Sequence, residues 1–183
     1  MIRITQGFLS GKKVLAPKTG ETRPTKSRVR EAIFHILQEQ IVGSTMLDLF
    51  AGSGIMGFEA ISRGVAKRCF FIDKNPLAVK TIKNTARNLG IDQRIFVYKK
   101  DVLSFLKTLR EQSALIYLDP PYSMHDLKKE METLLTILHN RNLLAPGGKL
   151  FLEMPKDISI TPPEDFSHKR RPYGNTHIWE LFY

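Results

Sequence analysis

Several features that are common in proteins are scarce or missing from this chain of 183 residues. The single cysteine, Cys69, cannot form an internal disulfide and falls far short of a metal-binding set. The five histidines show no metal-ligand spacing, so we expect no metal site. No apolar run reaches the roughly 18 residues that suggest a membrane span. The first residues show no apolar stretch behind a basic start, so we expect no secretory signal, no membrane partner and a cytoplasmic location.

Acidic residues are also scarce relative to basic ones. The chain has 28 Lys and Arg against 18 Asp and Glu, which leaves a net charge of +10. Residues 1–30 carry much of the excess, with Glu21 as their only acid. Phosphates are the obvious polyanionic partner of such a segment, so the charge favours a nucleic acid. A merely solvated basic surface is the alternative, and charge alone does not separate the two.

The pattern of apolar segments predicts one α/β domain with a mostly parallel sheet covered on both faces. The expected strands are 46–50, 68–72, 95–98, 114–118 and 149–153, the last preceded by a turn at 146–148. The expected helices are 55–63, 76–89, 102–110 and 126–139. Strands near 166–170 and 176–182 predict a closing antiparallel hairpin, which gives seven strands. Ahead of these, strands 2–9 and 13–16 predict a small hairpin, 17–26 a loop and 27–40 a helix.

A glycine turn follows the first strand of the expected sheet. Gly52, Gly54 and Gly57 have G-x-G-x-x-G spacing between a strand and a helix, where a ligand can approach the backbone closely. The pattern fits a dinucleotide site, a methyl-donor site or simply a tight turn. Asp48, inside the strand, could order the loop and meet the ammonium group of an amino-acid ligand.

Two further carboxylates follow the next two strands. Asp73 stands 19 residues after Gly54, at the strand end where an acid accepts hydrogen bonds from ribose hydroxyls. Asp101 could accept from an adenine amino group, or it could cap the helix that begins at Val102. The other candidate residues of the cofactor site are Phe50, Ala51, Ser53, Lys74 and Val102.

The tetrapeptide Asp119-Pro120-Pro121-Tyr122 ends the fourth strand, so it should face the same crevice as the glycine turn. The Asp119 carboxylate and the Pro120 carbonyl can grip both N–H bonds of an exocyclic base amine and aim its lone pair at an electrophilic methyl group. The two prolines hold that carbonyl outward. Tyr122 offers a ring on which a base can stack. An ordinary Pro-Pro loop is the alternative interpretation.

These residues resemble the class I S-adenosylmethionine methyltransferases that act on amino groups, within them the bacterial 16S rRNA guanine-N2 methyltransferase family (the guanine-966 enzymes). The signature Arg23-Pro24-Thr25 with Arg28–Phe34, the donor loop Asp48–Gly54 and the turn Asp119–Tyr122 carry the resemblance. The tail from about residue 155 matches less clearly.

The resemblance implies a Rossmann-like methyltransferase domain over 27–183, with 1–26 as a basic RNA-binding extension. It implies methyl transfer from S-adenosylmethionine to N2 of one guanine in 16S rRNA, leaving S-adenosylhomocysteine. It further implies that this rRNA is met within a small ribosomal subunit, and we expect a monomer. Arg23, Thr25, Arg28 and Arg30 become candidates for RNA contact, although an internal ion pair is the alternative for Arg30.

Three other functions are compatible with parts of the sequence. The same tetrapeptide could serve adenine N6 methylation in RNA or DNA, but the chain has little room for a separate target-recognition region. A nicotinamide-dependent dehydrogenase could use the glycine turn and Asp73, yet it leaves Asp119–Tyr122 unexplained. A non-catalytic RNA-binding module is opposed by the intact carboxylates and glycines.

Overall fold

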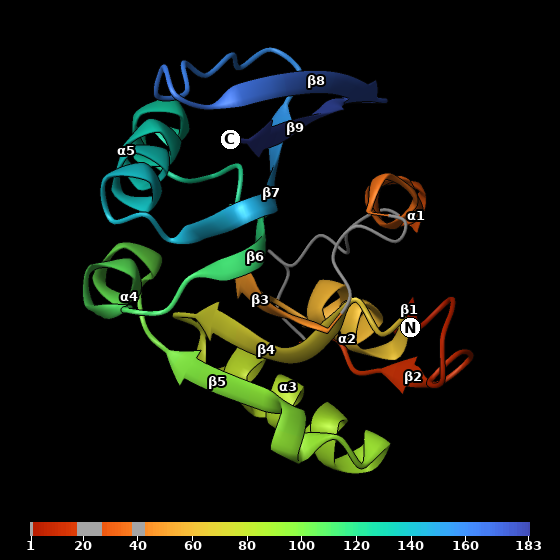
Figure 1. Ribbon diagram of the computed structural model, residues 1–183. Helices are drawn as coiled ribbons and strands as arrows, with labels where there is room; N and C mark the ends of the chain where they lie inside the picture. Colours follow the sequence, from red (N-terminus) through yellow and green to blue (C-terminus); the bar gives the residue numbers. More distant parts are fainter. Residues whose placement is uncertain (1, 18–26, 38–42) are drawn as a thin grey trace.

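The computed structural model describes residues 2–17, 27–37 and 43–183, and its centre is a sheet of seven strands (Figure 1). These strands are β3 (Ser44–Leu49), β4 (Ala66–Asp73), β5 (Ile95–Lys99), β6 (Ser113–Leu118), β7 (Leu144–Pro155), β8 (Ser167–Tyr173) and β9 (Thr176–Phe182). Their order in the sheet is β5-β4-β3-β6-β7-β9-β8, and β9 alone runs opposite to the other six strands. The predicted mostly parallel sheet with an antiparallel C-terminal hairpin is confirmed.

Helices cover both faces of the sheet, as Figure 1 shows. The helices are α1 (Ser27–Ile36), α2 (Ile55–Ser62), α3 (Pro76–Leu89), α4 (Val102–Thr108) and α5 (Leu127–Asn140), with a short 3-10 turn η1 (Asp92–Arg94) before β5. Apolar residues of α1, α2 and α3 share one core with the N-terminal hairpin, while those of α4 and α5 form the core on the opposite face. Within the described residues, no helix is both long and apolar enough to cross a membrane.

Helix α3 has the bounds that its sequence predicts, because signals at both ends fix it. Asn75 caps the N-terminus by accepting a hydrogen bond from the Leu77 backbone N–H at 2.8 Å, and Pro76 opens the first turn. Gly90 ends the helix with a left-handed φ of 68°. Strand β9 also has its predicted bounds, 176–182. The other described helices and strands of the main sheet differ from the prediction by a few residues at their ends, and β7 differs by more.

The N-terminal hairpin is present, but its strands are much shorter than predicted. β1 is only Ile2–Arg3 and β2 only Lys13–Val14, rather than 2–9 and 13–16. The reason is that several backbone N–H groups after Ile4 pair with α2 instead of a strand. Those of Thr5 and Gln6 donate to the Glu59 carboxylate, and that of Phe8 donates to the Ser62 carbonyl at 3.0 Å.

Glu59 attaches this hairpin to the body of the protein. Its fully buried carboxylate accepts from the backbone N–H and hydroxyl of Thr5, from Gln6 and from the Arg63 guanidinium at 2.8 Å. The Nε atom of Arg30 on α1 lies 3.5 Å from the same carboxylate. One side chain of α2 therefore holds together the hairpin and α1.

Strand β7 corrects another expectation, since it begins at Leu144 and not after the turn at 146–148. Ser113 of β6 pairs with Leu144, and Leu115 then pairs with Lys149, so the intervening residues form a bulge inside the strand. A β-carbon at Gly148 would lie 2.7 Å from the Ala145 carbonyl oxygen, which explains why a glycine is needed there. Residues 18–26 of the predicted loop 17–26 and residues 38–40 of the predicted helix 27–40 lie outside the described part of the chain.

Candidate functional site

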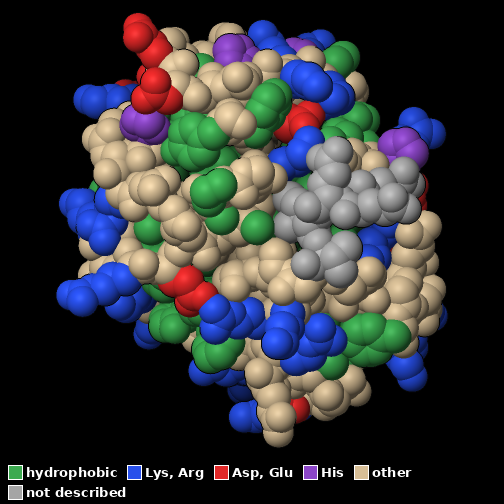
Figure 2. Space-filling view, viewed as in Figure 1, with side chains coloured by type: hydrophobic (Ala, Val, Ile, Leu, Met, Phe, Trp, Pro, Cys, Tyr) green, Lys and Arg blue, Asp and Glu red, His purple; other side chains and the backbone are tan. Residues whose placement is uncertain are grey.

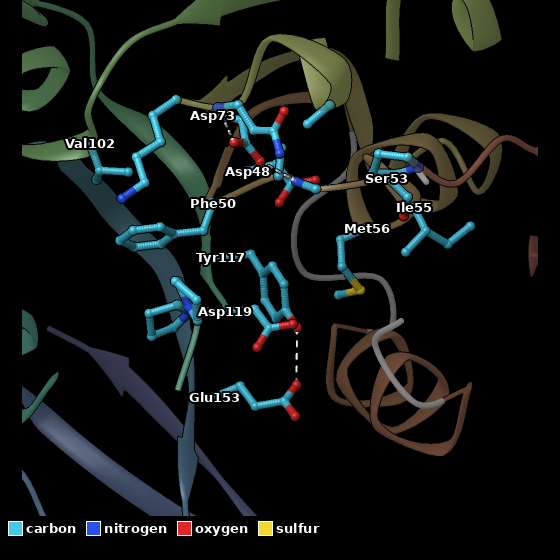
Figure 3. Close-up of a pocket in the computed structure, with 18 of the residues that line it drawn as sticks. Asp48, Phe50, Ser53, Ile55, Met56, Asp73, Val102, Tyr117, Asp119 and Glu153 are labelled. Carbon is cyan, nitrogen blue, oxygen red and sulfur yellow. Dashed lines mark hydrogen bonds between the residues drawn. The ribbon is translucent and has the colours of Figure 1, made fainter. Parts of the chain in front are cut away.

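A cavity of about 480 Å³ opens at the carboxyl ends of the parallel strands. It lies where the chain order reverses between β3 and β6, the usual ligand position in open α/β sheets. Figure 3 shows its lining side chains converging from the ends of β3, β4 and β6 and from β7. Thirteen of the predicted cofactor-site and catalytic residues line it: Asp48, Phe50, Ala51, Gly52, Ser53, Asp73, Lys74, Asp101, Val102, Asp119, Pro120, Pro121 and Tyr122.

The glycine loop reverses the chain between β3 and α2 through a run of left-handed conformations. Phe50, Gly52 and Gly54 have φ values of 64°, 55° and 74°, and such angles are uncommon for a residue with a side chain. Phe50 adopts one nevertheless, and its ring lines the cavity (Figure 3). The two glycines thus provide the conformational freedom that the tight turn requires.

Gly54 and Gly57 face the protein core and do not line the cavity. A β-carbon on Gly54 would lie 3.0–3.1 Å from Phe71, Ile82 and Phe58. A β-carbon on Gly57 would lie 2.4 Å from Phe71 and 2.5 Å from the Cys69 sulfur. These two glycines therefore allow α2 to approach the sheet closely, while Gly52 alone of the three borders the ligand space.

Asp73 and Asp101 lie on one side of the cavity with their carboxylates fixed by backbone groups. Asp73 accepts hydrogen bonds from Gly52 N–H and from Asn75 N–H, both at 2.8 Å. Asp101 caps α4 by accepting from Ser104 N–H at 3.0 Å, which confirms the capping role that was its alternative interpretation. Because a carboxylate can accept several hydrogen bonds, these contacts leave both residues suited to bind hydroxyl or amino groups.

Asp48 is buried at the floor of the cavity, with 2% of its surface exposed. Its Oδ2 atom accepts from Gly57 N–H at 3.1 Å and so ties β3 to α2. Burial raises the pKa of this carboxyl well above its usual range, and the nearby Asp73 raises it further, whereas the Gly57 bond opposes the shift. A cationic group in the cavity would relieve this unfavourable burial of charge.

The tetrapeptide after β6 forms the opposite wall. Asp119, Pro121 and Tyr122 are half-buried, and Pro120 is buried. The Tyr122 hydroxyl lies 3.0 Å from the Thr176 hydroxyl at the start of β9, so the C-terminal hairpin helps to position this ring. The glycine turn and the Asp-Pro-Pro-Tyr turn therefore line the same cavity, as predicted.

Two residues of this wall were missed by sequence reasoning. Tyr117, near the end of β6, and Glu153, on β7, both line the cavity, and the Tyr117 hydroxyl donates to Glu153 at 3.2 Å (Figure 3). A glutamate at the end of the apolar run Leu150–Leu152 was the available signal, because such a run seldom ends in a buried charge. Ile2, Ala16 and Pro17 of the hairpin region also reach the cavity, and no motif marks them.

Residues 2–182 match the protein family described as "Conserved hypothetical protein 95". The chain belongs to this family. It is 31% identical to a putative rRNA methyltransferase (YlbH) of Bacillus subtilis, over 97% of this chain and 96% of that protein. It is 29% identical to the ribosomal RNA small subunit methyltransferase D of Escherichia coli K12, over 99% of this chain and 89% of that one.

Solved structures agree with the sequence matches. A structure called a putative methyltransferase (yhhF) from Escherichia coli superposes with a TM-score of 0.84 at 26% identity, covering 98% of this chain and 96% of that one. A putative methylase from Haemophilus influenzae superposes with a TM-score of 0.81 at 28% identity, over 98% and 97% of the two chains. The resemblance noted from the sequence motifs is thereby confirmed, and the fold of this family member is that of class I methyltransferases.

The predicted RNA-contact residues of this family member lie in different settings. Arg23 and Thr25 fall outside the described residues. Arg28 is exposed on the first turn of α1. Arg30 is 3% exposed and faces Glu59, so the alternative of an internal ion pair is the one found. Burial lowers the pKa of Arg30, and the carboxylate opposes that shift.

Basic side chains also gather on β8, at the edge of the sheet. Figure 2 shows Lys, Arg and His side chains along the upper margin of the molecule, where Figure 1 places this strand. Lys169 and Arg170 are exposed there, and the Arg170 guanidinium stacks over the Trp179 ring at 5.2 Å. Arg171 pairs with the buried Glu180 and so belongs to the structure of the hairpin. Among the described residues, no group of three or more potential metal ligands occurs.

Proposed function

We propose that this protein transfers a methyl group from S-adenosylmethionine to the exocyclic N2 amine of a guanine in 16S rRNA. The observation that carries the proposal is the single cavity in which Asp73, Asp101 and the glycine loop face Asp119–Tyr122. The names of the relatives support methylation of rRNA as the general activity. The choice of guanine N2 and of this donor is the finer part of the proposal.

The residues of the cavity suit the proposed donor. Its volume, about 480 Å³, is within the range of about 300–1,000 Å³ that is typical of small-molecule sites. The carboxylates of Asp73 and Asp101 can accept from ribose hydroxyls and an adenine amine, and Asp48 can receive an ammonium group. Apolar side chains between them provide a surface for an aromatic ring; these are Phe50, Ile55, Met56, Ala78 and Val102.

The protein's own contribution to the reaction is to hold and orient the amine. The bound donor supplies an electrophilic methyl group on a sulfonium. The Asp119 carboxylate and the Pro120 carbonyl accept hydrogen bonds from the two N–H groups of the amine. The lone pair of the amine nitrogen then points toward the cavity. Tyr122 stacks on the base, with its hydroxyl held by Thr176. Such positioning can supply a large part of a rate enhancement without a covalent protein intermediate.

The partner in this proposal is 16S rRNA within an assembled or assembling small subunit, met by a cytoplasmic monomer. Arg28 and the exposed Lys169 and Arg170 are the described residues that we propose contact phosphates. Arg30 is not among them, because its guanidinium is committed to Glu59. The basic residues 1–26 are proposed as the RNA-binding extension of a methyltransferase domain at 27–183.

The test is to incubate the protein with labelled S-adenosylmethionine and small-subunit rRNA, naked and protein-bound, and to map the modified nucleotide. N2-methylguanine at one position is expected. Methyladenine would instead support the adenine N6 alternative. Calorimetry with S-adenosylhomocysteine and with NAD separates the proposal from a dehydrogenase, which would bind NAD.

The variant Asp119→Ala tests the role of the tetrapeptide. We expect kcat to fall by about 10²–10³-fold, because an acceptor that orients the amine in the transition state is lost. Affinity for S-adenosylhomocysteine should change less than about threefold, within the variation expected when no direct contact is removed. Asp157→Ala, at an exposed aspartate outside the cavity, is the matched control. Full activity of Asp119→Ala would contradict the mechanism.

A further inference from the structure

Glu153 is a buried carboxylate in the cavity wall that neither the glycine turn nor the Asp-Pro-Pro-Tyr turn explains. It lies on β7 with 4% of its surface exposed, between Leu152 and Met154, which are fully buried. Burying a carboxylate is costly unless hydrogen-bond donors meet it. Because Glu153 lies at the edge of the cavity, we expect its carboxylate to accept hydrogen bonds both from the protein and from a bound ligand.

The register of the sheet places Glu153 beside Asp119. Leu118 of β6 pairs with Leu152 of the neighbouring β7, so Asp119 and Glu153 are the next residues along the two strands. Neighbouring strands are about 4.8 Å apart, and alternate residues share a face, so both carboxylates lie on the same side as Tyr117. Figure 3 shows both of them close to the Tyr117 ring.

Tyr117 holds Glu153 in this place. The phenol is 2% exposed, and its hydroxyl donates to Glu153 Oε2 at 3.2 Å. A carboxylate has acceptor positions for several donors at once. The bond from Tyr117 therefore fixes the direction of the carboxylate without preventing it from receiving a donor of a ligand.

We infer that Glu153 is a specificity-determining residue that accepts the N1–H of the target guanine, next to the amine held by Asp119. This inference rests on the proposed function. Guanine carries its N1–H directly beside its N2 amine, so two adjacent carboxylates match two adjacent donors. An enzyme that works on an unstacked base reads this Watson–Crick edge by hydrogen bonds.

The same arrangement rejects other bases that carry an exocyclic amine. Adenine has a lone pair at N1 and cytosine has one at N3, in the position next to the amine. Either lone pair would face the Glu153 carboxylate and leave a buried anion without that donor. Sites built to hydrogen-bond a particular group discriminate strongly against analogues that lack it, because their buried polar groups stay unpaired.

The inference is tested with 2-aminopurine, which keeps the amine of guanine at position 2 but has a lone pair at N1. Small subunits are reconstituted with rRNA that carries either guanine or 2-aminopurine at the mapped position, introduced by ligation of a synthetic RNA segment. The wild-type protein should methylate guanine with a kcat/KM about 10- to 100-fold higher, the range expected for one hydrogen bond to a charged group. Equal rates on the two bases would overturn the inference without any variant.

The variant Glu153→Gln assigns that preference to the carboxylate. Its amide can still accept from Tyr117, but it turns a donor toward N1. We expect about a 10- to 100-fold loss of kcat/KM on guanine and little loss on 2-aminopurine, so that the ratio falls to about threefold or less. Tyr117→Phe should reduce the ratio in the same direction through loss of the positioning hydroxyl. Affinity for S-adenosylhomocysteine, measured by calorimetry, checks that both variants keep the donor site.

Equal losses on both bases in Glu153→Gln would show a packing role and overturn the inference. Failure of the proposed function is visible separately, in the wild-type protein alone. Digestion of the wild-type product would then give a methylated adenine or cytosine and no N2-methylguanine. A guanine preference that disappears in Glu153→Gln, with the donor affinity unchanged, is the result we expect.

Discussion

Replacement of Glu59 by glutamine should destabilise the protein strongly, although the two side chains have almost the same shape. The carboxylate is 0% exposed and forms ion pairs with two guanidinium groups, those of Arg63 at 2.8 Å and Arg30 at 3.5 Å. Arg30 is itself only 3% exposed, so water cannot take the place of the lost anion. The uncharged amide would therefore leave a buried cation without its counter-ion.

The expected size of the loss follows from this geometry. Removing one partner of a buried ion pair costs about 3–5 kcal/mol. In a domain of this size each kcal/mol lowers Tm by about 2–4 °C, so Glu59→Gln should melt about 6–20 °C below the wild type. The hydrogen bonds from Thr5 and Gln6 can partly persist to the amide oxygen, which favours the lower half of the range.

The assay is urea unfolding followed by circular dichroism, with Lys128→Gln as the control. Lys128 forms an exposed pair with Glu132 at 3.8 Å, and breaking such a pair should cost no more than about 1 kcal/mol. A loss below about 1 kcal/mol in Glu59→Gln, equal to that of the control, would refute the view that this carboxylate holds the hairpin and α1 to α2.

Two further predictions concern Asp48 on β3 and Gly57 on α2, whose side chain and backbone N–H are joined by a hydrogen bond. Asp48→Asn should raise the free energy of unfolding at neutral pH. It should also weaken S-adenosylhomocysteine binding by about tenfold or more, because the charge-assisted hydrogen bond that we propose from the ligand's ammonium group is lost. The sign follows from the pKa of Asp48, which burial raises well above 3.8. As pH rises above 3.8, the Asp48 carboxyl group loses its proton in the unfolded chain before it does so in the folded protein. The free energy of unfolding of the wild type therefore falls between the two pKa values, while that of the variant has no such fall. Urea unfolding between pH 4 and pH 8 measures it, and parallel pH profiles would contradict it. Gly57→Ala should lower stability by about 1–3 kcal/mol despite the better helix propensity of alanine, because the new methyl group would meet Phe71 and Cys69. An unchanged Tm would show that these side chains can move aside.

The parts of the site that could be predicted from sequence are those encoded within a few neighbouring residues. Local sequence spacing predicts the position of three features: the glycine turn, Asp73 at a strand end and the tetrapeptide that begins at Asp119. α3 was predicted to the residue because a cap, a proline and a glycine mark its ends. These signals do not depend on how distant segments pair.

Contacts between distant segments account for what was missed. Glu153 accepts from a tyrosine 36 positions away, and Glu59 accepts from Thr5 over 54 positions. Only the register of β6 against β7 reveals the first contact, and only the docking of the hairpin on α2 reveals the second. For the same reason the strand predicted at 2–9 was wrong, since a local pattern does not tell which partner a backbone N–H will choose.

The hydrogen bond between Tyr122 and Thr176 has a consequence for the synthesis of the protein. The two residues are 54 positions apart, and at about 5–20 residues per second the ribosome needs roughly 3–11 s to make the chain between them. During that interval the sheet can assemble from β3 to β7, but Tyr122 lacks this contact until the last strand pair has formed. The cavity wall at Tyr122 is therefore incomplete in the nascent chain, and the newly made protein completes it only as its final strands emerge.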